Sequence, residues 1–534
     1  MPGLLRRLAT TGAAYTASSV LSKLFAVFLL PIYTAYVSPA SYGAAEVMLA
    51  SVVAVSIVIR FGVIEAVLRF FYLAEPDADP SGRGRSFGDR VIRSGFAALA
   101  WSATLSALIA LPFAGPISEA LLGEADASLA RVAILGLWTL TLWELVLTIL
   151  RLDERARAYF TITSLNVIAT IPATLYLLID RGLEAEGILL GTFGTGVIFL
   201  GWRIWEERRR LSLRFETALL RRMLRFGLPT MPAELSLYSL SFIDRILIVR
   251  LAGLAEAGLY ALAIKFAQGM NLIARGFQLA WPPLAYSIAD DEEARRAYSL
   301  VFTWFAAVCA FFVVGLWLLA RWIVRLLAAP EFFDSYEAIG LLATGISLYA
   351  LYLVLVVVLG RTGRTELSLP ATLAGGVVNI GLNLALIPPL GIVGAGLALV
   401  ASYVVIVALT VFFTQRLFPI AYEWLRLALL VGLAAATVLA GELLLPTDGV
   451  LGLLGRTALW LVFPAILWFA RFPNTEERAL IRSLSSPAAI SARLAEIRRR
   501  GAERGGDGDP AGGRGAHAPE VLEAERRDED VAGS

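Results

Sequence analysis

The stretch GAAYTASSVLSKLFAVFLLPIYTAY, residues 12–36, decides the fold class of this chain. Arg6 and Arg7 precede it, as basic residues precede a secretory signal. However, it stays apolar well beyond the roughly 7 to 15 residues of a signal core. A helix needs about 20 apolar residues to cross a bilayer. Because many similar stretches follow, we expect residues 12–35 to form a retained transmembrane helix.

The composition extends this expectation to the whole chain. Of 534 residues, 58% are hydrophobic and 17% are charged, and the mean hydropathy is +0.72. This is more apolar surface than a soluble core needs, so the numbers predict an integral membrane protein. The net charge of +2 indicates no nucleic-acid partner. The single cysteine, Cys309, excludes an internal disulfide. The only histidine, His517, lies in a polar tail, so we expect no metal centre and no cofactor.

Hydropathy over windows of about 20 residues predicts fourteen transmembrane helices and therefore an all-α fold. The longest basic segment, residues 203–225, divides these helices into six and eight. We therefore expect a first lobe with its linker at 1–226, a second lobe at 227–416, two further helices at 417–473 and a cytoplasmic tail at 474–534. The predicted spans lie near residues 12–35, 43–66, 93–114, 129–150, 157–179, 186–205, 227–249, 256–280, 297–320, 336–360, 367–388, 391–415, 424–445 and 449–470.

Loop charge gives the orientation. When alternate loops are assigned to alternate sides, 24 arginines fall on one side and six on the other, with the tail left out. Basic residues concentrate in cytoplasmic loops. We therefore expect both termini to be cytoplasmic, and one missed helix would have scrambled this alternation.

Five basic residues lie inside apolar stretches instead of in loops. They include the only two lysines of the chain, Lys23 and Lys265, and the arginines Arg60, Arg245 and Arg275. A cation near the bilayer centre costs roughly 2.5 to 3.5 kcal/mol, so five without relief would cost about 12 to 18 kcal/mol. That is comparable to the whole stability of a typical protein. These side chains must therefore face water, carboxylates or an anionic ligand.

Carboxylates nearly match these cations in number, which leaves two interpretations open. Glu46, Glu144, Glu234, Asp244 and Glu65 also lie in or beside the spans. In one interpretation they form buried ion pairs with the cations and fix helix packing. In the other, the membrane interior keeps a cationic excess, because Lys23 and Lys265 lie deeper than Glu46 and Glu234. Arg60 and Arg275, nearer the cytoplasmic ends, could also snorkel to the interface.

The two halves of the chain show a weak internal repeat. An offset of 215 residues places Gly43 on Gly258 and Arg60 on Arg275, each at a similar position in its span. Many transporters are built from two such repeats. The alternative is that unrelated helices share a composition.

Three regions resemble a known family. They are PIYTAYVSPASYG at Pro31 to Gly43; FGLPTMP at Phe226 to Pro232 together with DRILIVRLAGLAEAGLYALAIKF at Asp244 to Phe266; and NIGLNLALIPPLGIVGAGLALVASY at Asn379 to Tyr403. These resemble polysaccharide biosynthesis flippases, the Wzx-like members of the multidrug/oligosaccharidyl-lipid/polysaccharide (MOP) exporter superfamily. The similarity covers residues from about 8 to 470.

The resemblance implies a multi-pass protein of the bacterial inner membrane, with two six-helix lobes around a central cavity plus two C-terminal helices. Such proteins move a polyprenyl-diphosphate-linked oligosaccharide from the cytoplasmic to the periplasmic leaflet by alternating access, alongside polysaccharide polymerase or export machinery. By resemblance, the cavity cations bind the diphosphate. In this chain they would be Lys23, Arg60, Arg245, Lys265 and Arg275. We expect a transporter and not an enzyme.

Energy coupling is a separate question. Glu144, Glu234 and Asp244 are candidates for a proton or sodium site, because an intramembrane carboxylate with a raised pKa can exchange a proton. Ion pairing with the neighbouring cations is the alternative role for each of them, as for Glu46.

Three other functions compete with glycan export. A lipid II-type precursor flippase would share the fold and the anionic substrate. A drug or cation antiporter of the same superfamily would be expected to show an acidic or aromatic cavity and about twelve spans. A membrane glycosyltransferase would need a metal and nucleotide site, for which the loop residues Asp77 and Asp79 are a weak candidate. The polar tail beyond Arg471 offers only a short amphipathic segment at 489–500.

Overall fold

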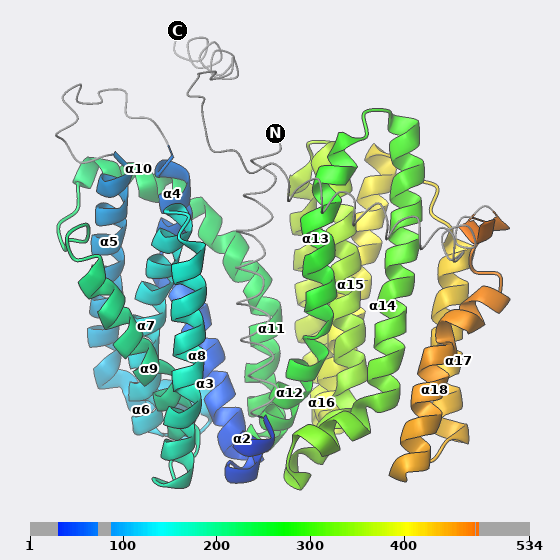
Figure 1. Cartoon of the computed structure of the whole chain (residues 1–534), viewed down its shortest axis with the longest axis horizontal. Coiled ribbons are helices and arrows are strands. Elements are labelled where there is room, and N and C mark those ends of the chain that lie inside the picture. Colours follow the sequence, from blue (N-terminus) through cyan, green and yellow to red (C-terminus); the bar gives the residue numbers. More distant parts are fainter. Residues whose placement is uncertain (1–29, 73–86, 476, 480–534) are drawn as a thin grey trace, which may run out of the picture. The chain divides into compact units, whose positions relative to one another are not determined.

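The computed structural model describes residues 30–72, 87–475 and 477–479, and within these ranges all regular structure is helical (Figure 1). The expected all-α fold class is confirmed. Lys23, Asp77, Asp79, residues 489–500 and most of the first predicted span lie outside the described residues. The helices are α2 (Leu30–Tyr36), α3 (Pro39–Ile59), α4 (Val63–Phe70), α5 (Phe87–Ala110), α6 (Ala114–Leu122), α7 (Ala127–Leu152), α8 (Ala156–Ile179), α9 (Ala185–Glu206), α10 (Thr217–Gly227), α11 (Met231–Ala252), α12 (Leu254–Ala267), α13 (Met270–Ser287), α14 (Asp291–Leu327), α15 (Tyr336–Arg361), α16 (Ser368–Leu417), α17 (Trp424–Leu444) and α18 (Gly449–Phe469).

Ten helical segments of the described part are long and apolar enough to cross a membrane. The protein is therefore a multi-pass membrane protein. The predicted seventh and eighth spans are also helical, as α11 and as the pair α12 and α13, but they do not meet the same length and hydropathy criteria. The total of fourteen stays a prediction, because the first span lies largely outside the described residues.

Helix α16 contains two of the predicted spans. Its 50 residues would measure about 75 Å if straight, more than twice the thickness of a bilayer core. Gly391 interrupts it with a φ of 53°, two residues after the Pro388–Pro389 pair. A Cβ on Gly394 would lie 2.3 Å from the Leu386 carbonyl oxygen, so the backbone on the two sides of the turn is in close contact. The segments therefore form a hairpin, as the separate spans at 367–388 and 391–415 predict.

Two helical bundles account for most of the packing. The first bundle contains α3, α5, α7, α8 and α9, and the second contains α11 to α16. Helix α3 also packs against α11 and α12, and one buried apolar cluster continues from the first bundle into the second through these helices. Helix α17 packs on α14. The bundles are thus in direct contact along α3, where charged residues of both halves meet.

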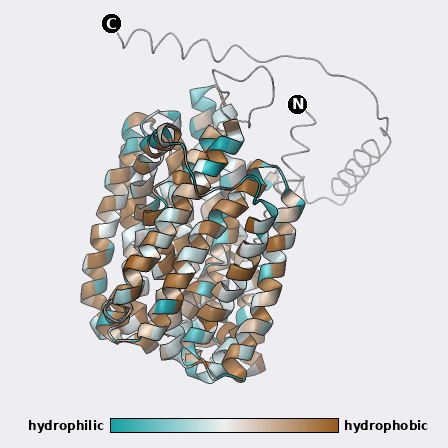
Figure 2. Ribbon diagram, turned by 90° about the vertical axis from the view of Figure 1, so that its left-hand side faces the viewer, coloured by the Kyte–Doolittle hydropathy of each residue, from teal (hydrophilic) through white to brown (hydrophobic). Residues whose placement is uncertain are grey.

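Apolar residues occupy outward as well as inward positions. In α8, α17 and α18, less than a quarter of the most apolar 18-residue segment is buried inside the protein. Large hydrophobic side chains of these helices therefore face outward. Hydrophobic residues dominate the helices between their ends, and hydrophilic residues gather nearer the ends (Figure 2). This pattern is expected of helices that face lipid, in which the backbone must satisfy its own hydrogen bonds.

The described residues 467–475 and 477–479 belong to a second unit of the chain. In its described part, Asn474 and Glu477 bond reciprocally: each side chain accepts from the other residue's backbone N–H at 2.8 Å. This is a capping-box arrangement that starts a helix. Arg478 donates to the carbonyl oxygen of Trp468 at 2.8 Å. All sites described below lie in the first unit, residues 1–466.

Candidate functional site

One charged contact between the bundles joins α12 to α3. The Lys265 ammonium donates to the Glu46 carboxylate and to the Tyr42 hydroxyl, each at 2.5 Å, and lies 4.9 Å from the centre of the Tyr42 ring. Glu46 is buried, whereas the Lys265 side chain is 31% exposed. Lys265 therefore has a carboxylate partner and an open side from which a second anion can approach.

Two glycines make this contact possible. A Cβ on Gly258 would lie 1.9 Å from the Pro39 carbonyl oxygen, and one on Gly43 would lie 2.1 Å from that of Leu254. Any larger residue would push α3 and α12 apart, because the obstacle on each side is backbone. These are the two glycines that the internal repeat aligns, so corresponding positions of the two halves lie against each other.

Further contacts join the bundles near the same ends of α3 and α12. The Thr34 hydroxyl accepts from the Ala329 backbone N–H at 2.9 Å, and Tyr42 meets Phe332 edge to face at 5.5 Å. Arg250 donates to the carbonyl oxygen of Glu119 at 3.1 Å. The loops involved belong to the side with few arginines, which the sequence assigns to the periplasm.

Arg60 forms the second ion pair between the bundles, at the other end of α3. It donates to Glu234 on α11 at 3.1 Å and to the backbone carbonyl of Ser56 at 3.1 Å. Close backbone contact again accompanies the pair, because a Cβ on Gly62 would lie 1.9 Å from the Gly227 carbonyl oxygen. The Arg60 side chain is 11% exposed and Glu234 is 41% exposed, so this pair borders solvent.

The remaining candidate cations have no partner in the described part of the chain. Arg245 lies on α11 within electrostatic range of Glu46, and its buried Nε makes no hydrogen bond to a described residue. Arg275 is exposed on α13 and makes no ion pair with a described residue. The second bundle thus holds three of the candidate cations, and among these three only Lys265 is ion-paired within the described ranges.

Asp244 points away from these cations into the second bundle. It is fully buried, and it accepts hydrogen bonds from Asn383 at 2.7 Å and from the Tyr260 hydroxyl at 3.1 Å. Asn383 in turn donates to Asn379 at 3.1 Å, while the Asn383 Oδ1 atom is buried with no hydrogen bond to a described residue. Its neighbour Arg245 is not among its partners, as their 100° separation on the helix predicts.

Neither asparagine was among the site residues predicted from the sequence. They are four residues apart in NIGLNLALIPP, an arrangement that places both amides on one face of an otherwise apolar helix. That spacing was a usable signal for a buried polar site. Glu144, by contrast, is half-buried on α7 and its carboxylate makes no ion pair or hydrogen bond within the described ranges.

A cavity of about 210 Å³ lies beside Asp244 inside the second bundle. Its polar lining includes Tyr260, Tyr349, Tyr403, Gln268 and Asn271. The sequence predicts a cavity between the lobes and none within the second bundle. The three tyrosines come from three different helices, so no local sequence pattern predicts that they line one cavity.

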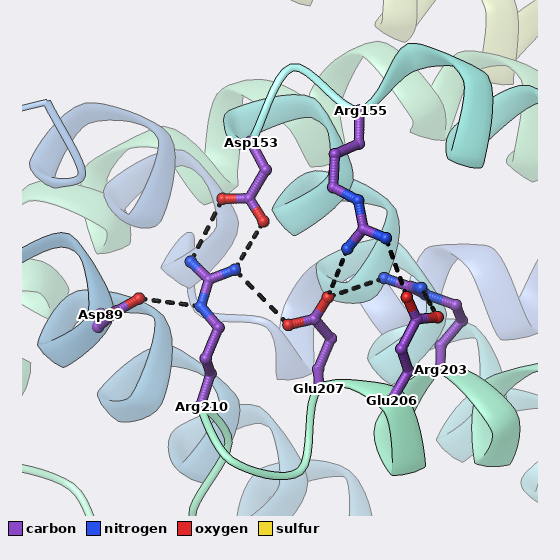
Figure 3. Close-up of polar contacts among 7 residues, drawn as sticks. All are labelled: Asp89, Asp153, Arg155, Arg203, Glu206, Glu207 and Arg210. Atoms are coloured by element: carbon purple, nitrogen blue, oxygen red, sulfur yellow. Dashed lines mark hydrogen bonds and ion pairs between the residues drawn. The ribbon is translucent and has the colours of Figure 1, made fainter.

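A charged network fastens the start of the linker to the first bundle (Figure 3). Arg210 donates to Asp153 at 2.6 Å and to Asp89 at 2.9 Å, and its guanidinium also lies 3.5 Å from Glu207. Arg155 donates to Glu207 at 3.0 Å, and Arg203 is bonded to Glu206 and Glu207. Each residue of the network thus has an oppositely charged partner, and the network holds the start of the linker against the first bundle.

The linker helix α10 continues this attachment. Arg90 donates twice to Glu216, at 2.6 and 2.9 Å, and these bonds hold the pKa of the Glu216 carboxyl below its ordinary value. Helix α10 packs against α4 and α5, and the Arg69 guanidinium lies 4.5 Å from the centre of the Phe226 ring. The N-terminal end of α11 is therefore held by the first bundle, although α11 itself packs in the second.

A model of the family described as "Polysaccharide biosynthesis protein" matches residues 36–337 of the chain. No curated protein sequence matches the chain.

Solved structures show the same fold. The lipid II flippase MurJ in an inward closed conformation is 14% identical, covers 87% of this chain and 100% of its own, and superposes with a TM-score of 0.67. An inward-facing multidrug resistance MATE family transporter of the MOP superfamily is 16% identical, covers 77% of this chain and 95% of its own, and has a TM-score of 0.60. An outward-facing structure of a multidrug resistance MATE family transporter of the MOP superfamily is 17% identical, covers 80% of this chain and 96% of its own, and has a TM-score of 0.51.

Proposed function

Because the chain belongs to the polysaccharide biosynthesis protein family, we propose that it is a flippase for a polyprenyl-diphosphate-linked oligosaccharide. The expected resemblance is confirmed by the family match and by the MOP-type fold. In the proposed reaction the glycan moves from the cytoplasmic to the periplasmic leaflet for synthesis of a cell-surface polysaccharide. The reaction is transport and involves no chemical step.

The observation that carries this proposal is the cationic face of the second bundle. Arg245 and Arg275 have no ion pair with a described residue, and Lys265 keeps an open side. Unpaired cations at membrane depth are costly unless an anion or water compensates them. A diphosphate supplies two phosphate groups that can accept charge-assisted hydrogen bonds from such donors.

The physical task of a flippase explains why such a face is useful. Sugars and phosphates lose their hydration when they enter hydrocarbon, and nothing there replaces the lost hydrogen bonds. A polar, cationic path offers replacement partners to the head group, while the polyprenyl chain stays in the bilayer. Lys23 and Arg60 would extend this path on the first lobe, as the sequence predicts.

The contacts between the bundles support alternating access. Gly43, Gly258 and Thr34 lie in contacts at the ends of α3 and α12 that the sequence assigns to the periplasm, and the Lys265–Glu46 pair lies about two helical turns further along α12. We propose that these contacts close the outer side in this conformation and separate when the lobes rock. On the inner side, the pair Arg60–Glu234 would be the contact that rearranges.

Asp244 is the carboxylate that best fits an ion-coupling role. It is buried, its partners are neutral, and the Asn383 Oδ1 beside it is unbonded within the described ranges. Carboxylate and amide oxygens suit a hard cation. Glu46 and Glu234 are paired with cations instead, and Glu144 remains a second candidate.

Transport by Asp244→Asn should lose its dependence on a sodium or proton gradient. Wild-type transport that persists after both gradients collapse would remove this role.

We propose that the protein resides in the bacterial inner membrane with both termini cytoplasmic. The arginine distribution of the loops supports this orientation. A polymerase or export machinery would take over the glycan on the periplasmic side.

Two other substrates remain candidates, each on a specific observation. The structural likeness to a lipid II flippase supports a peptidoglycan precursor, which also carries a diphosphate. The cavity beside Asp244, lined by several tyrosines, supports an organic cation and hence antiport. Glycan export fits the cationic face best, because a cation would be repelled by Arg245 and Lys265.

The test is reconstitution of the purified full-length chain in liposomes with a fluorescent polyprenyl-diphosphate oligosaccharide, read out by accessibility to an added glycosidase. Arg275→Ala should slow flipping about tenfold, a loss of roughly 1.4 kcal/mol of transition-state stabilisation. Lys265→Ala should slow it at least as much. Arg296→Ala, whose side chain is 77% exposed at the start of α14, is the matched control and should leave the rate unchanged. Wild-type rates in both Arg275→Ala and Lys265→Ala would refute the diphosphate site.

A further inference from the structure

The cavity in the second bundle has a largely aromatic and polar lining. Its aromatic residues are Tyr260, Tyr349, Tyr352 and Tyr403, and the ring of Tyr349 lies 5.7 Å from that of Tyr403. The hydroxyls of Tyr349 and Tyr403 make no hydrogen bond to another described residue. Packing alone would favour aliphatic side chains here, because each tyrosine brings a hydroxyl that needs a partner.

Two amide side chains complete the polar lining. Gln268 and Asn271 both line the cavity, and neither side chain is hydrogen-bonded within the described ranges. Gln268 is exposed, so it marks an open edge of the cavity. The cavity thus combines aromatic faces with free amide and phenol groups, each of which can donate and accept.

The backbone beside the cavity is irregular at membrane depth. The predicted eighth span divides into α12 and α13 at Gln268 and Gly269, where the N–H of Gly269 bonds to the carbonyl of Phe266, three residues back. Irregular backbone within a membrane is tolerated where it is buried in protein or lines a water-filled cavity. Interrupted helices also mark many transporter binding sites.

The cavity adjoins the cationic face. Asp244 and Ile264 line the cavity, and their sequence neighbours Arg245 and Lys265 belong to the cationic face. Arg275, the third candidate cation of the second bundle, lies within electrostatic range of Tyr349, which lines the cavity. A group linked directly to a diphosphate on the cations would be within reach of the cavity.

We propose that this cavity is a sugar-binding subsite that accepts the first sugar ring of the lipid-linked substrate, next to its diphosphate. This inference rests on the proposed function, and it adds a substrate-selecting site within the second lobe. The aliphatic carbon–hydrogen face of a pyranose ring would pack on Tyr349 or Tyr403. Its hydroxyls would exchange hydrogen bonds with Gln268, Asn271 and the free phenols. Asp244 already accepts hydrogen bonds from Asn383 and Tyr260, so the sugar would not bond to it and it would keep its proposed ion-coupling role.

A sugar fits this lining better than an organic cation does. The single carboxylate of the cavity already accepts two hydrogen bonds. Arg245 lies within electrostatic range of that carboxylate, and Arg275 lies within electrostatic range of Tyr349. A neutral ring with many hydroxyls pays no electrostatic cost beside these cations. The amides of Gln268 and Asn271 offer the sugar directional hydrogen bonds. A quaternary ammonium ion has neither a donor nor an acceptor and cannot form them.

The closing experiment compares two ligands on the full-length protein in lipid nanodiscs by native mass spectrometry. The probes are polyprenyl diphosphate and the same lipid bearing one glucose or one N-acetylglucosamine. The wild type should bind at least one sugar-bearing lipid about tenfold more tightly than the bare lipid. Y349L and Y403L should each reduce that preference about fivefold, while affinity for the bare lipid stays within twofold. Y403F, which removes only a hydroxyl, should show a smaller loss, and Y176L, on the exposed part of α8, should show none.

The outcomes separate the two proposals. If the wild type binds the bare lipid but prefers neither sugar-bearing probe, the sugar subsite is wrong and the flippase proposal stands. If Y349L and Y403L weaken both ligands equally, the tyrosines act on structure and the subsite is wrong. If these variants lose binding of tetraphenylphosphonium and keep the sugar preference, the cavity is a cation site. Absence of bare-lipid binding by the wild type would refute the proposed function, and the subsite with it.

Discussion

At the scale of single residues, the main result is the pairing of intramembrane charges. Lys265 and Glu46 come from different halves of the chain and meet at 2.5 Å, with one partner buried and the other partly exposed. Removing one charge of such a pair leaves the other uncompensated in a poorly solvated place. Lys265 therefore has two possible anionic partners, Glu46 within the protein and the proposed diphosphate.

A double-mutant cycle measures the strength of this pair. We expect Lys265→Met and Glu46→Gln each to lower the free energy of unfolding, and the double variant to lose less than the sum. The coupling should be about 1 to 3 kcal/mol. Equilibrium unfolding in mixed micelles is the measurement. Arg325 and Asp448, whose side chains are 43% and 70% exposed, form the control pair and should couple by less than about 1 kcal/mol. Strict additivity at Lys265 and Glu46 would show that the ion pair contributes no stability.

At the scale of helices, close backbone contact positions the charged side chains. Gly43 on α3 and Gly258 on α12 let the two helices approach until the backbones touch. Small residues at helix crossings are a common feature of membrane proteins because lipid-exposed helices associate through packing. The ion pair at Lys265 lies two helical turns from this crossing, so it depends on the same approach.

The substitution Gly258→Ala tests the crossing. The new Cβ would lie 1.9 Å from the Pro39 carbonyl oxygen, and backbone cannot move aside as a flexible side chain does. We expect the contacts on the predicted outer side to open, at a cost to the closed form of about 1 to 3 kcal/mol. Distances between spin labels at Asp180 and Glu331, in loops that the sequence assigns to the outer side, should shift to longer values.

The matched control for this substitution is Gly276→Ala on α13, where an added Cβ meets nothing within 4 Å. It should leave the label distances unchanged and stabilise α13 by roughly 0.5 to 1 kcal/mol. Equal behaviour of the two alanine variants would contradict the role assigned to the crossing.

At the scale of the whole molecule, the two bundles touch along α3, through the ion pairs of Lys265 and Arg60 and through the Tyr238 hydroxyl, which donates to the Ala50 carbonyl oxygen at 3.1 Å. The first bundle also holds the linker through the network around Arg210 and through the Arg90–Glu216 bonds. Helix α11 is thus tied to the first bundle at its start and packs in the second along its length. Rocking of the bundles would have to bend or rotate this helix, and Pro229 and Pro232 lie at its beginning.

A covalent link across the predicted outer side tests rocking directly. Cysteines at Thr34 and Ala329, which contact each other through a 2.9 Å hydrogen bond, should be cross-linked by a short bifunctional thiol reagent. The native Cys309 is buried and should not interfere. The link should abolish flipping, and a reductant-cleavable reagent should allow recovery. The reagent should not change the flipping rate of either single-cysteine variant. Unimpaired flipping by the linked protein would contradict alternating access.

Much of this architecture could be predicted from the sequence. Lipid requires helices with satisfied backbones and apolar surfaces, so the hydrophobic stretches indicate the all-α membrane fold and, at the separate spans 367–388 and 391–415, even the hairpin in α16. The periodicity also placed Asp244 and Arg245 on different faces of one helix, as the structure shows. The orientation and the count of fourteen spans stay predictions.

The sequence by itself determined which residues are charged inside the membrane and which face of its own helix each one occupies. Only the tertiary structure decided that Lys265 meets Glu46, that Arg60 meets Glu234, and that Asn383 meets Asp244. The physical reason is that helical periodicity is a local property, whereas a partner is set by how distant helices pack. The repeat aligned Gly43 with Gly258, but their contact, and the tyrosine-lined cavity in the second bundle, arise only when α3, α12, α15 and α16 come together.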